Sequence, residues 1–277
     1  MISAPSVKFA DLHVHTSCSD GTFTPAQLIK EALARGLSAL AIVDHDTTEA
    51  QEEAMAQANG TGLEVIPGIE LTARHENQEI HILGYFLDYR NQELLEKLKS
   101  VRLNRIQRVY QIVKNLEELG LKLNPEAVFS ISGKATVGRM HIARALVKEG
   151  LVDSTAEAFR RYIGDKSPAY VLGFRLSVPE AIQLIQASGG VAVLAHPYIL
   201  HNDALITEFA GYGLQGLEVH YPEHSQSMVN FYLDLAKKLN LLVTGGTDFH
   251  GSAKPEIKLG MIKIPLELVE KLRQAKK

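Results

Sequence analysis

The sequence DLHVH at residues 11–15 is the stretch that decides how the rest of the chain is interpreted. Residues 9–14 alternate in polarity and are rich in apolar and β-branched side chains, which predicts a β-strand with a side-chain period of two. His13 and His15 therefore project from one face, about 7 Å apart along the strand. The loop that follows carries Asp20. Two imidazoles and a nearby carboxylate can converge on a divalent cation, so this stretch predicts part of a metal site.

Residues of the same ligand types recur in or just after other short apolar runs. An isolated histidine in such a place is usually a core or surface residue, but the repetition favours a shared site. Because the carboxyl ends of parallel strands meet at one face of a barrel, the side chains that follow them lie close together. These further candidate ligands are His45, Glu70, His81, His196, Asp248 and His250.

Length, composition and charge fit one large α/β domain, with or without a small addition. The chain has 277 residues, 45% of them hydrophobic, and a formal net charge of −3. This charge argues against a protein that coats nucleic acid, but it allows a local basic patch. Cys18 is the single cysteine, which excludes an intramolecular disulfide and a zinc ribbon. The sequence shows no signal-type leader and no apolar run of membrane-spanning length, so we expect a cytoplasmic protein without a membrane partner.

Taken in order, the chain alternates between short apolar runs and helical patterns. This alternation implies parallel strands joined by right-handed crossovers. We count about seven strands, one fewer than in a complete eight-unit barrel. The predicted strands are 9–14, 39–43, 63–69, 80–87, 191–195, 216–219 and 241–244. The glycine pattern at residues 211–216 precedes a strand instead of following one, so it predicts a helix-to-strand loop and not a dinucleotide-binding turn.

Residues 91–175 show a different pattern, in which helix follows helix. This segment holds 15 lysines and arginines against 9 acidic residues, whereas the remaining chain holds 14 basic and 23 acidic residues. A basic helical cap over an acidic, metal-binding barrel suits an anionic substrate held between the two. A solvated helix surface explains the same charges equally well, and both interpretations stay open.

Together these motifs resemble the polymerase and histidinol phosphatase (PHP) family of metal-dependent phosphoesterases. The motifs that carry the resemblance stand in the family's order: His13-x-His15, Ser19-Asp20-Gly21, Asp44-His45-Asp46, Pro67-Gly68-Ile69-Glu70, His81, Ala195-His196-Pro197 and Thr247-Asp248-x-His250. The stretch GRMHIAR at residues 138–144 resembles the branch of nucleotide phosphatases and 5′–3′ exoribonucleases. Met140 stands where that branch more usually has proline, and Arg139 and His141 keep their places.

The resemblance implies a distorted (β/α)7 barrel formed by residues 1–90 and 176–277, with residues 91–175 as a helical insertion that caps the substrate. It also implies up to three divalent metal ions. One ligand set would be His13, His15, Glu70 and Asp248, a second would be Asp20, His45 and His250, and a third would be Glu70, His81 and His196, so that Glu70 bridges. Imidazoles and carboxylates without a thiolate favour borderline metals, with manganese slightly ahead of zinc and with iron as a further candidate.

Beyond the metal ligands, three residues of the insertion are candidates for contact with the substrate. Arg139 could clamp two phosphate oxygens. His141 could hold another phosphate oxygen or protonate the leaving oxygen, and Lys166 could act as a point charge, although a solvated lysine is at least as ordinary. In the barrel, Asp46 could carry a proton or simply begin a helix. Cys18 fits a small packing residue better than a ligand.

We therefore expect a hydrolase, a phosphatase or phosphodiesterase, that cleaves phosphate esters of nucleotides with a metal-activated water. The candidate substrates are 3′,5′-bisphosphate nucleosides, nucleoside monophosphates and the 5′ ends of short RNA. A phosphatase for a non-nucleotide metabolite such as histidinol phosphate is the alternative. A metal-stabilised module without catalysis is a third hypothesis, and the filled ligand positions argue against it. The sequence indicates no protein partner.

Overall fold

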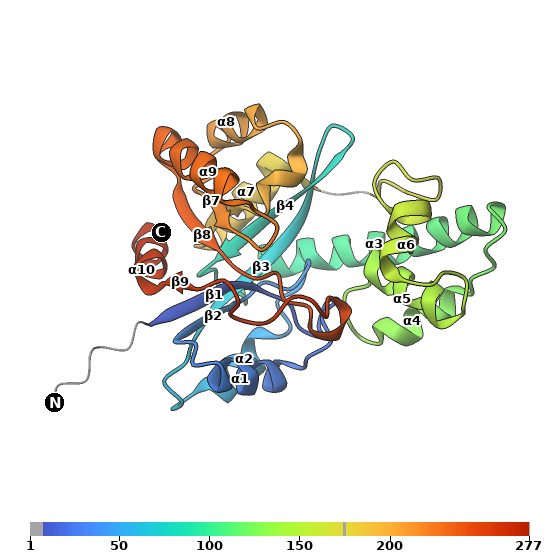
Figure 1. Cartoon of the computed structure of the whole chain (residues 1–277), viewed down its shortest axis with the longest axis horizontal. Helices are drawn as coiled ribbons and strands as arrows, with labels where there is room; N and C mark the ends of the chain where they lie inside the picture. Colours follow the sequence, from blue (N-terminus) through green and yellow to red (C-terminus); the bar gives the residue numbers. More distant parts are fainter. Residues whose placement is uncertain (1–7, 174–175, 277) are drawn as a thin grey trace.

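The computed structural model describes residues 8–173 and 176–276. The outer limits predicted for the barrel, at residues 1 and 277, and the predicted end of the insertion at residue 175 lie outside the described residues. Within the described ranges, a curved sheet is covered by helices, and further helices extend from one side of it (Figure 1). None of the described helices is both long and apolar enough to cross a membrane.

The described elements alternate at both ends of the chain and are helical in the middle. The strands are β1 (Phe9–Val14), β2 (Ala39–Ile42), β3 (Glu64–His75), β4 (Gln78–Tyr85), β5 (Leu176–Ser177), β6 (Val191–Leu194), β7 (Gly216–His220), β8 (Leu242–Gly245) and β9 (Ile264–Pro265). The α-helices are α1 (Pro25–Ala34), α2 (Gln51–Ala58), α3 (Gln92–Glu118), α4 (Pro125–Ser132), α5 (Arg139–Lys148), α6 (Thr155–Ala158), α7 (Val178–Ala187), α8 (Ala204–Gly211), α9 (Gln226–Leu239) and α10 (Leu266–Ala275).

The strands form one sheet in the order β8-β7-β6-β4-β3-β2-β1-β9, with β5 paired to β3. Strands β1, β2 and β3 are parallel, and so are β6, β7 and β8. Strand β4 runs antiparallel to both β3 and β6, and β9 runs antiparallel to β1. A parallel bridge between Val14 and Phe249 brings the chain after β8 back to β1. The distorted barrel is confirmed and all seven predicted strands are present, joined by the two-residue strands β5 and β9, but the expectation of parallel pairing is wrong for β4.

The departure from parallel pairing arises in the β3–β4 hairpin. The predicted strand ended at residue 69, whereas β3 continues to His75 and β4 begins at Gln78. The intervening Glu76 adopts a positive φ of 51°, which permits a tight turn. Ile69, Leu71 and Ala73, which alternate with Glu70 and lie on the face toward α7, are fully buried in the core shared with that helix. The hairpin therefore replaces the helix that a parallel crossover would need.

Two adjacent glycines allow the end of β8 and the chain after it to lie against β7 and β1, respectively. A Cβ atom on Gly246 would overlap the backbone nitrogen of His13, and one on Gly245 would overlap the carbonyl oxygen of His220. The backbone can approach this closely only where side chains are absent. Gly246 thus lets the loop after β8 lie next to β1, where the first histidines lie, and Gly245 lets the end of β8 lie close to β7.

Local sequence signals agree with the structure at several element ends. Thr24 and Ser177 cap α1 and α7, and each cap includes the reciprocal bond from the third helical residue that the residue types at these positions favour. Residues 211–216 connect the end of α8 to the start of β7, which confirms the predicted helix-to-strand loop.

The helices α3 to α6 lie between β4 and β5 in the sequence and extend away from the barrel (Figure 1). Leu94 and Leu98, near the start of α3, pack in the core of the barrel. Ile112 and Leu116, nearer its end, pack in a separate hydrophobic core with α4 and α5. The helical character of this segment agrees with the sequence analysis. Its division from the barrel as a domain stays a prediction.

Candidate metal centre

The predicted metal ligands gather at one end of the barrel. His13 lies in β1, Glu70 in β3 and His81 in β4, and the remaining ligands lie in loops directly after β1, β2, β6 and β8. All of them are buried except His45 and His81, which are partly buried. The sequence analysis expected this convergence, and it results from the shared direction of the strands that precede the loops.

Glu70 lies between imidazoles on both sides of its carboxylate. One oxygen, Oε2, is 3.4 Å from His13 Nε2, 3.2 Å from His15 Nε2 and 3.3 Å from His45 Nδ1. The other oxygen, Oε1, is 2.8 Å from His81 Nδ1 and 3.2 Å from His196 Nε2. This central position is compatible with a carboxylate that bridges two ions.

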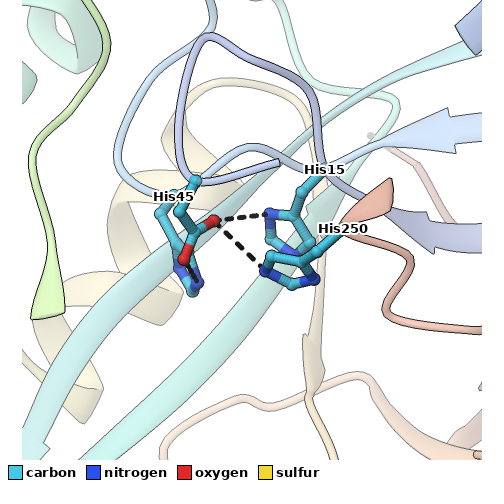
Figure 2. A group of neighbouring side chains, drawn as sticks. His15, His45 and His250 are labelled. Carbon is cyan, nitrogen blue, oxygen red and sulfur yellow. Dashed lines mark ion pairs between the residues drawn. The ribbon is translucent and has the colours of Figure 1, made fainter. Parts of the chain in front are cut away.

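Asp20 collects a second group of histidines. Figure 2 shows the rings of His15, His45 and His250 around a carboxylate. Asp20 Oδ1 is 3.2 Å from His250 Nε2 and 3.9 Å from His15 Nδ1, and Oδ2 is 3.8 Å from His45 Nε2. His15 therefore faces this group with one ring nitrogen and Glu70 with the other.

Asp248 faces a third set of imidazoles through one oxygen only. Its Oδ1 is 3.5 Å from His13 Nε2, 3.3 Å from His15 Nε2 and 3.3 Å from His250 Nδ1. Asp248 has a positive φ of 54°, as does His196 with 27°. Such backbone costs roughly 1–3 kcal/mol per residue and is often kept at functional sites.

The chemistry of these atoms fits bound divalent cations. Buried polar atoms are nearly always hydrogen-bonded. Here, with respect to residues 8–173 and 176–276, hydrogen-bond partners are lacking for His15 Nδ1, Asp20 Oδ1, His45 Nδ1, Glu70 Oε2, His81 Nδ1 and His196 Nδ1. Imidazole nitrogens and carboxylate oxygens that face one another without hydrogen bonds are the donor set that borderline metals take.

The described residues form three sets whose ligand atoms lie within 4.8 Å of one another. These are His15, Asp20, His45 and His250; His13, His15 and Asp248; and His45, Glu70 and His81. His15 and His45 each belong to two sets, whereas the sequence analysis gave each of them to one. The assignment of individual ions to these residues stays a prediction.

The electrostatic environment keeps the central carboxylates ionised. Burial works against the charge of Glu70, but the neighbouring His45 and His81 hold its pKa well below the usual value. Burial also opposes the charge of Asp248, and there Lys254 contributes most to holding the pKa well below the usual value. Metal ligands must be deprotonated, so both groups are in the form that binds cations.

Carboxylates outside the ligand set hold the ligands in place. Glu218 in β7 accepts a hydrogen bond from the backbone N–H of His196 at 2.7 Å, and its other oxygen lies 2.9 Å from His13 Nδ1. A carboxylate on Nδ1 turns the other ring nitrogen of His13, Nε2, toward the cluster as an acceptor. Glu218 was not found by sequence analysis, although its place in the strand 216–219 was an available signal.

Two further buried aspartates tie down the loops that bear ligands. Asp44 accepts hydrogen bonds from the backbone N–H and the hydroxyl of Thr16, at 2.7 and 2.6 Å. Asp11 does the same with Thr247, at 2.9 and 2.6 Å. The first loop presents Asp20 and the second presents Asp248. The two carboxylates therefore fix the positions of ligands without belonging to the ligand set.

A cavity of about 200 Å³ opens over the cluster. Its floor includes Asp20, His45, Glu70, His196 and Asp248, and its opposite wall includes Arg105 and Arg108 of α3 and Arg139 of α5. The lining also includes Tyr198, Tyr221 and Lys254. The barrel and the helical segment thus enclose one space.

The arginines of this wall are held by carboxylates that are not in the ligand set. Arg139 donates to Asp165 at 2.6 Å and to Glu79 at 3.1 Å, and Arg108 lies 3.6 Å from Glu79. Arg105 donates from Nε to Asp46 Oδ2 at 2.7 Å. These pairs fix the guanidinium groups before any ligand arrives.

Of the residues predicted to contact the substrate, the structure brings only Arg139 into the lining of this cavity. His141 is buried, and its Nδ1 accepts a hydrogen bond from the backbone N–H of Gly138 at 3.0 Å. Burial lowers the pKa of His141. Lys166 is exposed and is not among the lining residues. The roles of His141 and Lys166 stay predictions.

Asp46 lies beside the cavity and not in its lining. Its Oδ1 accepts from the backbone N–H of Thr72 at 2.8 Å, and its Oδ2 accepts from Arg105. Helix α2 begins at Gln51, so Asp46 does not begin a helix. The sequence analysis missed Arg105 and Arg108, although Arg102, Arg105 and Arg108 recur at three-residue spacing in the amphipathic run.

An α/β barrel with a buried histidine and carboxylate cluster at one end, facing a wall of arginines, is the architecture of a hydrolase that acts on phosphoester bonds. Residues 11–166 match the family model of the PHP domain. The chain therefore belongs to the PHP family, as its motifs indicated.

Known proteins resemble the chain over nearly its whole length. It is 34% identical to a 5′–3′ exoribonuclease of Haemophilus influenzae, over 87% of this chain and 89% of that protein. It is also 34% identical to a 3′,5′-nucleoside bisphosphate phosphatase of Chromobacterium violaceum, over 87% and 86% of the two chains. A solved structure from Bifidobacterium adolescentis, assigned as a metal-dependent phosphoesterase, matches with a TM-score of 0.89 and 31% identity over 99% of this chain and 98% of that chain.

Proposed function

We propose that this protein hydrolyses phosphate esters of nucleotides, with 3′,5′-bisphosphate nucleosides and the 5′ ends of short RNA as the leading substrates and nucleoside monophosphates as further ones. The observation that carries the proposal is the cavity between the histidine and carboxylate cluster and the three arginines. Two relatives that act on such molecules, an exoribonuclease and a bisphosphate phosphatase, support it.

The metal ions would be held by His13, His15, Asp20, His45, Glu70, His81, His196, Asp248 and His250. Bound divalent ions activate water and neutralise charge on phosphate oxygens. We propose manganese as the native metal, slightly ahead of zinc and with iron as a further candidate; imidazole and carboxylate donors without a thiolate suit all three of these metals. The buried aspartates Asp11 and Asp44 hold the loops so that these ligands need little rearrangement.

The arginine wall would bind the phosphate oxygens that face away from the barrel. Arg139 presents a planar guanidinium that can hold two oxygens at once. Arg105 would add a second cation, and Asp46 would orient it through their hydrogen bond. This arrangement favours a positioning role for Asp46 over the predicted role as a proton carrier. A substrate with two phosphate groups would meet cations on both sides of the cavity.

The test is phosphate release by manganese-loaded protein from a panel of esters. The panel holds a 3′,5′-bisphosphate nucleoside, 5′-AMP, 3′-AMP, a short 5′-phosphorylated RNA and histidinol phosphate. We expect the bisphosphate or the RNA to be preferred, with activity lost in His196→Ala and weakened in Arg139→Ala. Activity on histidinol phosphate alone, with the same rate in Arg139→Ala as in the wild type, would instead support a phosphatase for a non-nucleotide metabolite. Metal-loaded protein inert on every ester would support the non-catalytic module.

A further inference from the structure

Lys254 brings a cation to the barrel side of the cavity. It follows the short 3₁₀ helix Gly251–Ala253 in the loop after β8, and its side chain lines the same cavity as Arg139. The ammonium group lies 2.5 Å from Asp248 Oδ2, and 27% of the lysine side chain is exposed. A charged group that is partly open to a cavity can meet a ligand without moving far.

The two oxygens of Asp248 have separate partners. Oδ1 faces the imidazoles of His13 and His15. Oδ2 accepts a hydrogen bond from the Tyr221 hydroxyl at 2.8 Å in addition to the one from Lys254. Oδ2 therefore has a neutral donor in Tyr221 and a charged donor in Lys254.

An ammonium group carries three N–H donors. Among the described residues, Lys254 Nζ forms one hydrogen bond, to Asp248. The other donors are available to an acceptor in the cavity. An anion with several oxygens, such as a phosphate group above the ligand cluster, provides such acceptors.

The counterion of Lys254 also differs from those of the arginines. Arg105 and Arg139 pair with Asp46 and with Glu79, which are outside the ligand set. Lys254 pairs with Asp248, whose charge would be shared with a divalent cation. A lysine with such a partner keeps more of its positive charge for an incoming anion.

We propose that Lys254 binds a phosphate oxygen of the substrate from the barrel side, opposite the arginines of α3 and α5. It is then a substrate-binding residue and not only a partner of Asp248. This inference rests on the proposed function, because it names a residue that would bind the phosphate of the same substrate.

The experiment compares Lys254→Met, Lys254→Arg and Tyr221→Phe in manganese-loaded protein. It measures metal content and the affinity for inorganic phosphate by titration calorimetry, at saturating manganese. We expect Lys254→Met to lose about tenfold or more in phosphate affinity, because a charged hydrogen bond is removed. Lys254→Arg restores most of that affinity, because the charge is kept.

Tyr221→Phe is the matched control, because it removes the other donor to Asp248 Oδ2 without removing a charge. We expect it to change phosphate affinity far less than Lys254→Met does. Lys258→Met is the charge control, because Lys258 is exposed and donates to the carbonyl of Pro255. We expect no change in phosphate affinity for this variant.

Equal phosphate affinities for Lys254→Met and the wild type overturn the inference, as does a wild type that binds no phosphate. Equal losses of phosphate affinity in Lys254→Met and Tyr221→Phe, in proportion to lost metal, also overturn it, because Lys254 then acts only through Asp248. If phosphate affinity depends on Lys254 but no ester of the panel is hydrolysed, the proposed function fails and the binding role stands.

Discussion

The barrel side of the cavity is built from residues at strand ends, whereas the insertion side is built from arginines on helices. On the barrel side, Glu70 is almost fully buried among imidazoles that are buried or partly buried, and Asp44 and Asp11 hold the loops that follow β1 and β8. On the insertion side, Arg105 and Arg139 are tied to separate carboxylates. The difference indicates that metal binding and phosphate binding can be changed independently, and the following predictions test this separation.

The largest effect is expected from Glu70→Gln, which removes the negative charge between five imidazoles. We expect metal content to fall and phosphate release to drop by more than about 100-fold, since even partners outside the ligand set typically cost 10–100-fold. Metal analysis measures the metal content, and steady-state kinetics measure the rate of phosphate release. Glu64→Gln in the same strand is the control, because Glu64 pairs with Arg273 away from the cluster. Full metal content and activity in Glu70→Gln would contradict the central role of this carboxylate.

Arg139→Ala should lower kcat/KM by about 10- to 100-fold through the loss of a charged contact to phosphate. Metal content should change far less than activity, because Arg139 pairs with Asp165 and with Glu79, and only Glu79 in turn contacts a candidate ligand among the described residues, His81 at 3.0 Å. Arg161→Ala is the control on the same insertion, since Arg161 is exposed and pairs with Glu157. Metal loss in Arg139→Ala would break the separation between the two sides.

Arg105→Met and Asp46→Asn should each lower kcat/KM by roughly tenfold, because Asp46 is expected to act through Arg105. The double variant should then be little worse than either single one. A double-mutant cycle on kcat/KM measures this coupling. Full additivity would mean that Asp46 has a role apart from Arg105, as the predicted proton carrier would.

The smallest effect is expected from Lys166→Ala. Lys166 is exposed and outside the cavity lining, so activity should change by less than about twofold, as for an ordinary surface residue. The same kinetic assay decides. A tenfold loss of activity would support the predicted contact between Lys166 and the substrate.

The barrel side of the site was predictable because the ends of strands can be located from the sequence pattern. A period-two run that ends in His13-x-His15 already specifies which face the imidazoles share. Most of the later candidate ligands lie just after an apolar run, and the common direction of the parallel strands then brings these side chains together. The antiparallel β4 was missed, because the run 80–87 has the same pattern in either direction. Its candidate ligand, His81, reaches the cluster all the same.

The insertion side was less predictable for a physical reason. A charged residue on an amphipathic helix has the same sequence pattern whether it faces solvent or a neighbouring cavity. Arg105 and Arg108 turn inward only because α3 packs against the barrel, which is a long-range contact. Their counterions, Asp46 and Glu79, come from distant loops and strands. The motif around Arg139 was recognised by its resemblance and not by its pattern.

Helix α3 packs in two hydrophobic cores, and this double packing keeps the width of the cavity constant. Its 27 residues span about 40 Å. Leu98 is anchored in the barrel and Ile112 in the insertion, with Arg105 between them. The insertion could swing away only if this helix bent or lost one of its cores. The cavity would therefore accept only molecules that fit its existing width. Products could leave without a movement of the insertion away from the barrel.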